Sequence, residues 1–544
     1  MDVSTHSEYL NHLRQRLLPL LEHPASTAKL ELYAYAFVTV TELNLDPQRE
    51  ALEALYCPTG QGAPKDPVCM LRSLLLMTLL HETSSPDAWA RRLKGDDLLA
   101  LLAGFEPGQT PCGTALREFI IRYADGPYAL RSQQDKPLSQ RLRGQHERRL
   151  SDTTKARQAE ADRQGLSQSE ALCRRLLEEA NTSRDPHALQ TRLDDMLVEL
   201  GLRPTIEAGL VGDDASHLIV EGDGTPLTTA ASPRGQHTCA CPPGSQDGDH
   251  PKRYTSGTAQ WCCHPSRGWV FGDESYTISA HVNGRDIPLM TIMGTGNESD
   301  YTLGPKALDE LLKVIQAHAL SLDLDIFIGD GHHDTRPFYR YCRVKGIRTV
   351  IPLNGDAAED AKPPPPHPHL DAYPDVVFDT DGTPLCPQGC RMRHEHYDRR
   401  ANTHLFTCPA TRRNGRGEWS FYPDECPTGT DCCPDKLLGY SRSLKVDVNP
   451  RVLPEIPRCT PRYKTLYTER TGAERSNRVE DAYHLDRCTR HAPYGLVRLT
   501  FVNIAKHARL RWLPRVDTVA ASRALMQEVI ARLRAGNPTM TTPE

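Results

Sequence analysis

The chain has 544 residues, of which 38% are hydrophobic and 25% are charged, and its formal net charge is −5 at pH 7. This length is enough for about three or four domains with sizeable cores, and the acidic balance argues against a generic nucleic-acid binder. The sequence contains no run of about 20 apolar residues and no basic-then-apolar N-terminal signal, so we expect a cytoplasmic protein that does not cross a membrane.

Residues 1–125 are predicted to form an all-helical N-terminal domain. Ser85-Pro86 is a good helix start, because Ser is a favoured N-cap and Pro is favoured at the first helical position. This helix is predicted to run to Gly104, and a second one to begin near Thr114. The link between them is longer than in a helix-turn-helix. The spacing therefore leaves a DNA-end-binding domain and an ordinary helical bundle both open.

Basic residues are concentrated in two places. Arg131–Arg157, within a predicted charged helical connector at 126–208, holds 8 Lys or Arg against 3 Asp or Glu. Arg458–Arg515 holds 13 against 5. Such segments can form a basic groove on an acidic protein, although solvated helix faces have the same composition.

Residues 209–355 are predicted to form the first part of an α/β domain. Strand-like runs occur at 216–227 and in GWVFGDESYTISAHV and IPLMTIMGT. A predicted helix at 306–320 leads to the strand LDIFIGDG, and the helix TRPFYRYCRVKG leads to the strand IRTVIPLN. Three strands followed by alternating helix and strand indicate a mixed sheet with crossover helices.

Asp223 and Asp330 each lie where a predicted strand ends in a glycine turn. Side chains just beyond strand ends project into the space above a sheet, where ligands commonly bind. Asp-Gly is also a very common turn, so each aspartate taken alone is equally a turn former. His332 and His333, with the neighbouring Asp334, would fit a hydrolase-type metal site; the simpler interpretation is that they line the site or cap the next helix.

The segment from Tyr467 onward is predicted to be helical. At 100° per residue, Tyr467, Arg470, Glu474 and Arg478 fall at roughly 0°, 300°, 340° and 20°, on one narrow face. Glu480 points away from that face. A carboxylate can hold a divalent metal and an arginine can hold phosphate, so Glu474 is the expected metal ligand of this helix.

Three carboxylates, from two strand ends and one packed helix, could hold two Mg²⁺ ions roughly 3.5–4 Å apart. This set comprises Asp223, Asp330 and Glu474. We further expect 356–457 to be a Pro/Cys-rich insert, 458–520 to complete the α/β core, and 521–544 to be a C-terminal helix with a frayed tail.

Several of the 17 cysteines lie in two clusters, which in a chain without an export signal favours a metal over disulfides. The candidate ligands of a structural Zn²⁺ in the first cluster are Cys386, Cys390, Cys408, Cys426, Cys432 and Cys433, with His394 or His396 as substitutes. Those of a possible second site are Cys239, Cys241, Cys262, Cys263 and His264. Adjacent cysteines rarely ligate one zinc together, and free thiols in a loop-rich insert remain the alternative.

The chain resembles the DDE transposases of bacterial insertion sequences, which have an RNase H-like catalytic domain. One large group carries the signature Tyr-x2-Arg-x3-Glu-x6-Lys, which Tyr467, Arg470 and Glu474 match, with Asp481 in place of the lysine. YTERTGAERSN also resembles the related form R-T-x-x-E-R, which includes Arg475.

Other stretches extend the resemblance from roughly residue 68 to residue 512. DGTPL and IGDGHHDTRPFYRYCRVKGIRTVIPL match the first and second aspartate strands, with His333 where the family has tyrosine and Asp334 keeping the following acid. The cysteine segment resembles the insert that precedes the glutamate helix, and LLALLAGFEPGQTPCGTALREF resembles the N-terminal helical domain.

The resemblance implies a prokaryotic, nucleoid-associated transposase that cleaves transposon ends with Mg²⁺ and transfers the freed strand into target DNA. Asp223, Asp330 and Glu474 would be catalytic, and a homodimer would bind the transposon-end and target DNA. The residues expected to contact DNA are Tyr467, Arg470, Arg475 and Arg478, with Arg478 replacing the signature lysine. A metal-dependent nuclease or phosphohydrolase on the same fold, or a domesticated DNA-binding protein without catalysis, are the alternatives.

Overall fold

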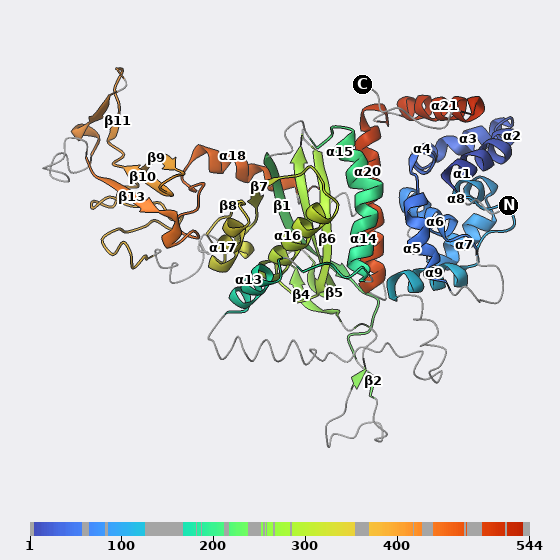
Figure 1. Cartoon of the computed structure of the whole chain (residues 1–544), viewed down its shortest axis with the longest axis horizontal. Helices are drawn as coiled ribbons and strands as arrows, with labels where there is room; N and C mark the ends of the chain where they lie inside the picture. The colour runs from blue at the N-terminus through green and yellow to red at the C-terminus, as the bar shows by residue number, and fades with distance from the viewer. Residues whose placement is uncertain are drawn as a thin grey trace.

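The structure is a computed structural model of the chain (Figure 1). It describes residues 5–56, 65–81, 85–125, 167–180, 182–186, 188–211, 217–234, 236–237, 252–253, 256, 258–264, 267–282, 285–353, 369–416, 418–426, 439–472, 475, 483, 492–516 and 519–536. Among these residues, no helix combines the length and the apolar character needed to cross a membrane.

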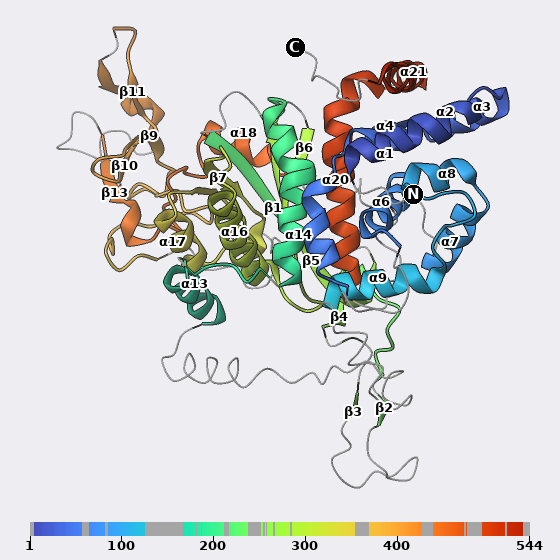
Figure 2. The same cartoon turned by 45° about the vertical axis from the view of Figure 1, so that its right-hand side comes forward.

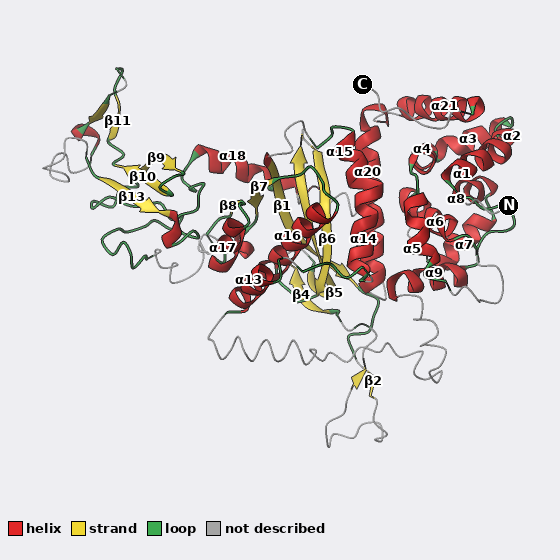
Figure 3. Ribbon diagram, in the orientation of Figure 1, coloured by secondary structure: helices red, strands yellow, loops and turns green. Residues whose placement is uncertain are grey.

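Three parts follow one another along the long axis of the molecule (Figure 1). A helical region that includes the N-terminus lies at one end, a mixed β-sheet with its helices lies in the middle, and a small β-rich part lies at the other end. Figure 3 shows helices alone in the N-terminal region, and strands in the central sheet and in the β-rich part. The predicted N-terminal helical region and the mixed sheet are thus confirmed.

The N-terminal region consists of short helices around one apolar core. They are α1 (His6–His12), α2 (Leu18–Leu20), α3 (Pro24–Leu32), α4 (Ala34–Glu42), α5 (Arg49–Glu53), α6 (Pro67–Leu79), α7 (Pro86–Lys94), α8 (Asp97–Ala103) and α9 (Gly113–Asp125). The single helix predicted from Pro86 to Gly104 is wrong. The chain breaks at Gly95, and the Asp96 side chain caps α8 by accepting from the amide of Leu99.

Helices α14 (Leu189–Leu197), α15 (Arg203–Glu207) and α20 (Ala492–Val516) link this region to the sheet, and α21 (Val519–Ala535) packs on α4. Helix α13 (Gln168–Glu178) packs instead on the helices that cover the sheet. In Figures 1 and 2, α14 and α20 lie side by side between the sheet and the N-terminal helices. Leu499 and Phe501 of α20 and Met526 of α21 belong to the same buried cluster as Phe37 of α4. The two ends of the chain therefore share one core.

The central sheet has the strand order β4-β5-β1-β7-β8, and β6 pairs with β5 beyond the end of β4. Its strands are β1 (Leu218–Thr228), β4 (Gln260–His264), β5 (Gly268–Val282), β6 (Arg285–Thr295), β7 (Leu324–Ile328) and β8 (Arg348–Val350). β1, β5 and β6 are antiparallel, whereas β7 is parallel to β1 and β8 to β7. Helices α16 (Asp300–Ala317) and α17 (Arg336–Val344) provide the two crossovers. A short separate pair, β2 (Gln236–His237) and β3 (Lys252–Arg253), lies outside this sheet.

Both faces of the sheet are covered. Side chains alternate between the faces along each strand, and on one face Val220 and Phe327 pack with Leu308 of α16 and Phe338 of α17.

The opposite face is covered by α18 (Pro461–Glu469) and α20. Ile219, Ile326 and Val350 pack against Leu466 of α18. Near the other edge, the side-chain amide of Asn503 in α20 donates to Thr291 Oγ1 of β6 at 2.8 Å.

The β-rich part, residues 369–458, lies between β8 and α18 and is called the Cys-bearing segment below. Its strands are β9 (Arg393–Asp398), β10 (Thr403–Thr407), β11 (Thr411–Arg413), β12 (Trp419–Phe421) and β13 (Ser441–Lys445). The order β13-β10-β9 makes one small sheet, and β11 and β12 make a hairpin. Two ion pairs join it to the core: Arg451 Nη2 lies 2.6 Å from Asp334 Oδ2, and Arg343 Nη2 lies 2.6 Å from Asp447 Oδ1.

Three boundaries differ from those predicted. β1 does not end at the Asp-Gly turn but continues to Thr228, because residues 220–228 pair with β5 along their whole length. α16 begins at Asp300 and not at Lys306. The helix that contains Tyr467 ends at Glu469, and Arg470 forms its cap. The single face predicted for residues 467–478 stays a prediction, because Glu474 and Arg478 lie outside the described residues.

Candidate functional site

Asp330 is the best-anchored carboxylate of the candidate site. It lies two residues after β7 and caps the short turn Gly331–His333. Its Oδ1 accepts hydrogen bonds from the His332 amide at 2.9 Å and from His333 Nδ1 at 2.8 Å, and its Oδ2 lies 2.9 Å from His332 Nδ1. Burial by itself raises the pKa of Asp330, but the bonds and charges of His333 and His332 hold that pKa below its ordinary value. Asp330 therefore remains a carboxylate.

His333 holds Asp330 in place from the core. Its ring is fully buried, and its Nε2 lies 2.5 Å from the hydroxyl of Tyr276, which is also buried. If Nδ1 donates to Asp330, Nε2 accepts from the Tyr276 hydroxyl. The helix α16 approaches the ring closely at Gly304, where a Cβ would lie 2.8 Å from His333 Cδ2. A chain of hydrogen bonds thus runs from the core to the carboxylate.

Asp223 lies beside Asp330 across the parallel pair β1–β7. Glu221 of β1 pairs with Ile328 of β7. Asp223 follows Glu221 by two residues and Asp330 follows Ile328 by two residues, so the two aspartates lie at the same level of the sheet. Burial, followed by the charge of Asp300, raises the pKa of Asp223 to about 7, and Arg470 opposes this rise. The structure therefore brings together two of the three predicted catalytic acids.

Two further carboxylates, Asp300 and Glu274, belong to the same site and were not predicted. Asp300 lies in the first turn of α16, and Glu274 lies in β5. A Cβ on Gly224 of β1 would collide with the Asp300 carboxylate and lie 3.0 Å from Glu274 Oε1. Burial and then the charges of Asp300 and Asp223 raise the pKa of Glu274 to about 9. Burial also raises the pKa of Asp300.

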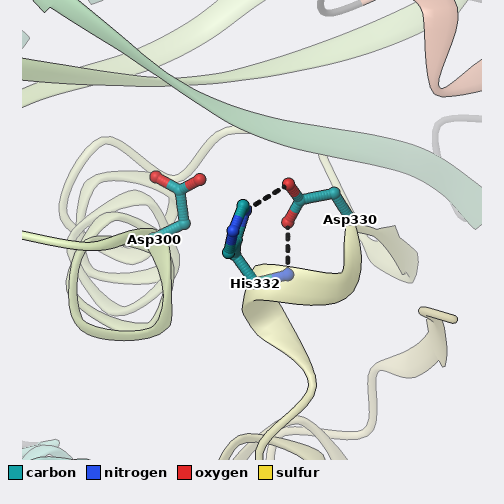
Figure 4. Close-up of side chains that lie close together, drawn as sticks. All are labelled: Asp300, Asp330 and His332. Atoms are coloured by element: carbon teal, nitrogen blue, oxygen red, sulfur yellow. Dashed lines mark hydrogen bonds and ion pairs between the residues drawn. The ribbon is translucent and has the colours of Figure 1, made fainter. Parts of the chain in front are cut away.

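We call Asp223, Glu274, Asp300 and Asp330 the acidic cluster. In the part of the chain that the structure describes, Asp300, Asp330 and His332 are the one trio whose ligand atoms all lie within 4.8 Å of one another. Figure 4 shows the Asp300 and Asp330 carboxylates on either side of the His332 ring, with Asp330 bonded to both the ring and the backbone of His332. The side chain of His332 is 72% exposed, so it can turn toward or away from the carboxylates.

The donor chemistry of this site suits a divalent cation. Two like charges about 4.8 Å apart repel by about 3 kcal/mol at an effective dielectric constant of about 20. Within the described residues, the raised pKa values of Asp223 and Glu274 reflect this crowding together with burial. Carboxylate oxygens are ligands for Mg²⁺ and Mn²⁺, and an imidazole such as that of His332 also suits Mn²⁺. The residues therefore fit a Mg²⁺ or Mn²⁺ ion.

Arg470 is the predicted DNA-contact residue that the structure brings to the acidic cluster. Its charge lowers the pKa of both Asp223 and Asp300. Tyr467, one turn earlier, stacks on Tyr463 with ring centroids 5.8 Å apart.

The other residues predicted on this segment lie elsewhere or are not described. The Arg475 guanidinium forms an ion pair with Asp286 at 3.2 Å, and Asp286 also lies 2.6 Å from His281. Glu474 and Arg478 lie outside the described residues.

The basic segment Arg458–Arg515 is only partly available to a partner. Within Arg458–Arg515, Arg458 and Lys506 are buried. The guanidinium of Arg458 donates to the Tyr339 hydroxyl and to the carbonyl of Ile351. The segment Arg131–Arg157 lies outside the described residues.

The predicted second zinc site is described only in part. Cys239 and Cys241 lie outside the described residues, whereas Cys262, Cys263 and His264 lie in β4. Because side chains alternate along a strand, Cys263 points to the side opposite Cys262 and His264. In the first cluster, Cys432 and Cys433 lie outside the described residues.

Asp300 and Glu274 were missed for different reasons. The predicted helix began at Lys306, whereas α16 contains Pro305 and begins at Asp300. Glu274 could have been found from the sequence, since it is an acidic residue inside an otherwise strand-like run.

Comparisons with known proteins show little likeness. No family model matches the chain, and no curated protein matches it. Among solved structures, the Mos1 transposase paired-end complex with left transposon end is 16% identical, with a TM-score of 0.14, and the match covers 52% of this chain and 77% of that chain. The Mos1 strand transfer complex is 14% identical, also with a TM-score of 0.14, and covers 51% and 75%. Likeness this weak does not identify a function, which has to be inferred from the site.

Proposed function

We propose that this chain is a DDE-type transposase that cleaves transposon ends and joins the freed strand to target DNA. The observation that carries the proposal is the acidic cluster beside the middle of β1 and the end of β7, with the Arg470 charge beside it. Carboxylates gathered next to an arginine are suited to a metal-bound phosphodiester, because the arginine can bind a phosphate oxygen.

The sheet supports an RNase H-like catalytic domain. Three antiparallel strands are followed by two helix–strand crossovers, and the acidic residues come from neighbouring strands and from the first crossover helix. The Cys-bearing segment between β8 and α18 is then an insert in this domain.

The roles of the residues follow from their surroundings. Asp223, Asp330 and Asp300 would hold Mg²⁺, with Glu474 as the further ligand that the family resemblance implies. The bound Mg²⁺ would supply activation of a water or a 3′-hydroxyl and stabilisation of the leaving oxygen. His333 keeps Asp330 ionised and oriented through its 2.8 Å bond.

DNA is the proposed partner, and a homodimer is the proposed assembly, since two transposon ends have to be joined. Arg470 would bind a phosphate near the scissile bond, which fixes the register of the DNA without reading its sequence. Tyr467 and Arg478 stay proposed DNA contacts. Arg475 would have to leave its ion pair with Asp286 to reach DNA.

The test is cleavage and strand transfer by the purified full chain. Duplexes carrying the inverted repeats that border its gene would be incubated with a target plasmid and Mg²⁺ or Mn²⁺. We expect nicked ends and joined products from the wild type and none from Asp330→Asn. Asp325→Asn is the matched control, because Asp325 lies in the same strand and pairs with Arg348 outside the acidic cluster.

A transposase, a nuclease and a non-catalytic DNA-binding protein would give different results in this assay. Cutting without joining would support a nuclease and refute strand transfer. Binding of the ends without cutting would support a DNA-binding protein and refute catalysis. Equal products from wild type and Asp330→Asn would remove the acidic cluster from the reaction.

A further inference from the structure

Four cysteines of the Cys-bearing segment come together from three separate stretches of chain. Cys386 and Cys408 are buried, while Cys390 and Cys426 are partly buried. The Cys386, Cys426 and Cys408 thiols are all close enough to Cys390 to raise its pKa, after the effect of burial. The remaining two cysteines predicted for this site lie outside the described residues.

The backbone around Cys386 and Cys390 is a tight turn. The Cys386 amide donates to the carbonyl of Cys390 at 2.9 Å, and the Gly389 amide donates to the carbonyl of Cys386 at 2.8 Å. Gly389 has φ of 75°, a left-handed conformation that glycine adopts without strain. This turn brings two thiols of one short stretch close together, and the Cys386 thiol contributes to the raised pKa of Cys390.

The other two thiols are brought in by a second turn and a hairpin. The Thr411 amide donates to the carbonyl of Cys408 at 2.9 Å, which turns the chain into β11. The Tyr422 amide, just after β12, donates to the carbonyl of Ala410 at 2.8 Å. The hairpin therefore returns the chain beside Cys408, and Cys426 follows four residues later.

The Cys-bearing segment has little apolar material to hold these turns. Among the described residues of 369–458, the main buried cluster has nine members, and Cys386 is one of them. Small units with thin cores usually need a disulfide or a metal to be stable. Cys386, Cys390, Cys408 and Cys426 are not joined in disulfides, so the cross-link to consider for them is a metal.

We propose that Cys386, Cys390, Cys408 and Cys426 bind one structural Zn²⁺ as a four-thiolate site that holds the Cys-bearing segment together. Four sulfur donors in a closed set are typical of structural zinc. Binding would convert four thiols to thiolates and release four protons, leaving a site with net charge −2, so it requires no oxidant or reductant.

Zinc binding would also tighten the present arrangement. Among the described residues, no three of these sulfurs lie within 4.8 Å of one another. Zn–S bonds of about 2.3 Å in a tetrahedron place the sulfurs about 3.8 Å apart. The metal would therefore draw the hairpin of β11 and β12 toward the turn at Cys386–Cys390.

The first test is the zinc content of the purified full chain, measured by plasma mass spectrometry. We expect about one zinc per chain in the wild type and a loss of at least tenfold in Cys386→Ser, Cys408→Ser and Cys426→Ser. Cys459→Ser is the matched control, because Cys459 lies next to the same segment outside the four-thiol set, and it should keep its zinc. Zinc-free wild type, or full zinc in Cys386→Ser, would overturn the proposal.

The second test does not depend on whether the variants fold. Thiols of the native wild-type chain would be counted with a thiol-specific reagent before and after zinc removal by a chelator. The count should rise by four, with zinc released in step. An unchanged count would overturn the proposal. Neither measurement depends on DNA cleavage, so the outcome is independent of the proposed transposase activity.

Discussion

Removing one negative charge from the acidic cluster should make the metal-free protein more stable. Asp300 is the residue to change, because it lies close to Asp223, Glu274 and Asp330 and makes no ion pair with a cation among the described residues. Asp300→Asn keeps the shape of the side chain and the start of α16 while removing the charge.

The size of the effect follows from the spacing. Asp300 and Asp330 offer ligand atoms within 4.8 Å of each other. At an effective dielectric constant of about 20, two full charges at this distance repel by about 3 kcal/mol. Partial protonation at neutral pH reduces this, so we expect a gain of about 1–2 kcal/mol, or a rise in Tm of about 2–8 °C.

The control is Asp309→Asn in the same helix. Asp309 is more deeply buried than Asp300 and lies among partners of opposite or neutral charge: Lys313 at 2.9 Å, Lys345 at 3.5 Å and the Tyr341 hydroxyl at 2.8 Å. Neutralising it leaves two lysines without their carboxylate and should lower stability by about 2–4 kcal/mol. Two isosteric changes in one helix should therefore shift Tm in opposite directions.

The assay is thermal unfolding of the full chain, first with a chelator and then with Mg²⁺ or Mn²⁺. The wild type should gain stability with the cation, by about 2.7 kcal/mol at a concentration 100 times Kd. Asp300→Asn should gain much less. If the metal-free variant is less stable than the wild type, the carboxylates of the acidic cluster do not destabilise the fold by repelling one another. If both proteins gain equally from Mn²⁺, Asp300 is not a ligand of the cation.

Three other changes test separate features. Arg451→Ala removes the cation beside the buried carboxylate of Asp334 and should lower the free energy of unfolding by about 2 kcal/mol, with proteolysis appearing first in the Cys-bearing segment, whereas Arg451→Lys should restore part of it. Gly472→Ala would place a Cβ against the Glu221 carboxylate and should reduce DNA cleavage with little change in far-UV circular dichroism; unchanged cleavage would show that this approach is not needed. Burial lowers the pKa of His507 to about 3, so below pH 6.5 the unfolded chain binds more protons than the folded chain. The free energy of unfolding should therefore fall by about 2 kcal/mol between pH 7 and pH 5 because of this residue. This fall should be absent in His507→Gln.

The sheet could be predicted because its strands are apolar and its turns carry glycine. Asp223 was correctly placed near Asp330 although the reasoning about it was partly wrong. β1 does not stop at Asp223, since pairing of Asp223 with Thr277 carries the strand further. What places Asp223 near Asp330 is the parallel register of β1 and β7, and that register depends on the partner strand.

The rest of the site depends on tertiary contacts that no local pattern records. Arg475 matches a motif, yet it is bound by Asp286 from the β5–β6 end of the sheet. Arg458 counted toward a basic segment, yet it is buried against Tyr339. Asp300 enters the site because α16 tolerates Pro305 within it, at the loss of one backbone hydrogen bond. In each case the tertiary contacts of the residue, and not the local sequence pattern, determine where it lies.

The shared core of the two chain ends has a consequence for synthesis of the protein on the ribosome. The N-terminal helices pack against Leu499 and Phe501 of α20 and against Met526 of α21, which emerge last. Until then, the face that these helices present to α20 stays exposed and open to aggregation or chaperone binding. A nascent chain released early would lack the helices that complete this core, so truncated products should be degraded rather than accumulate.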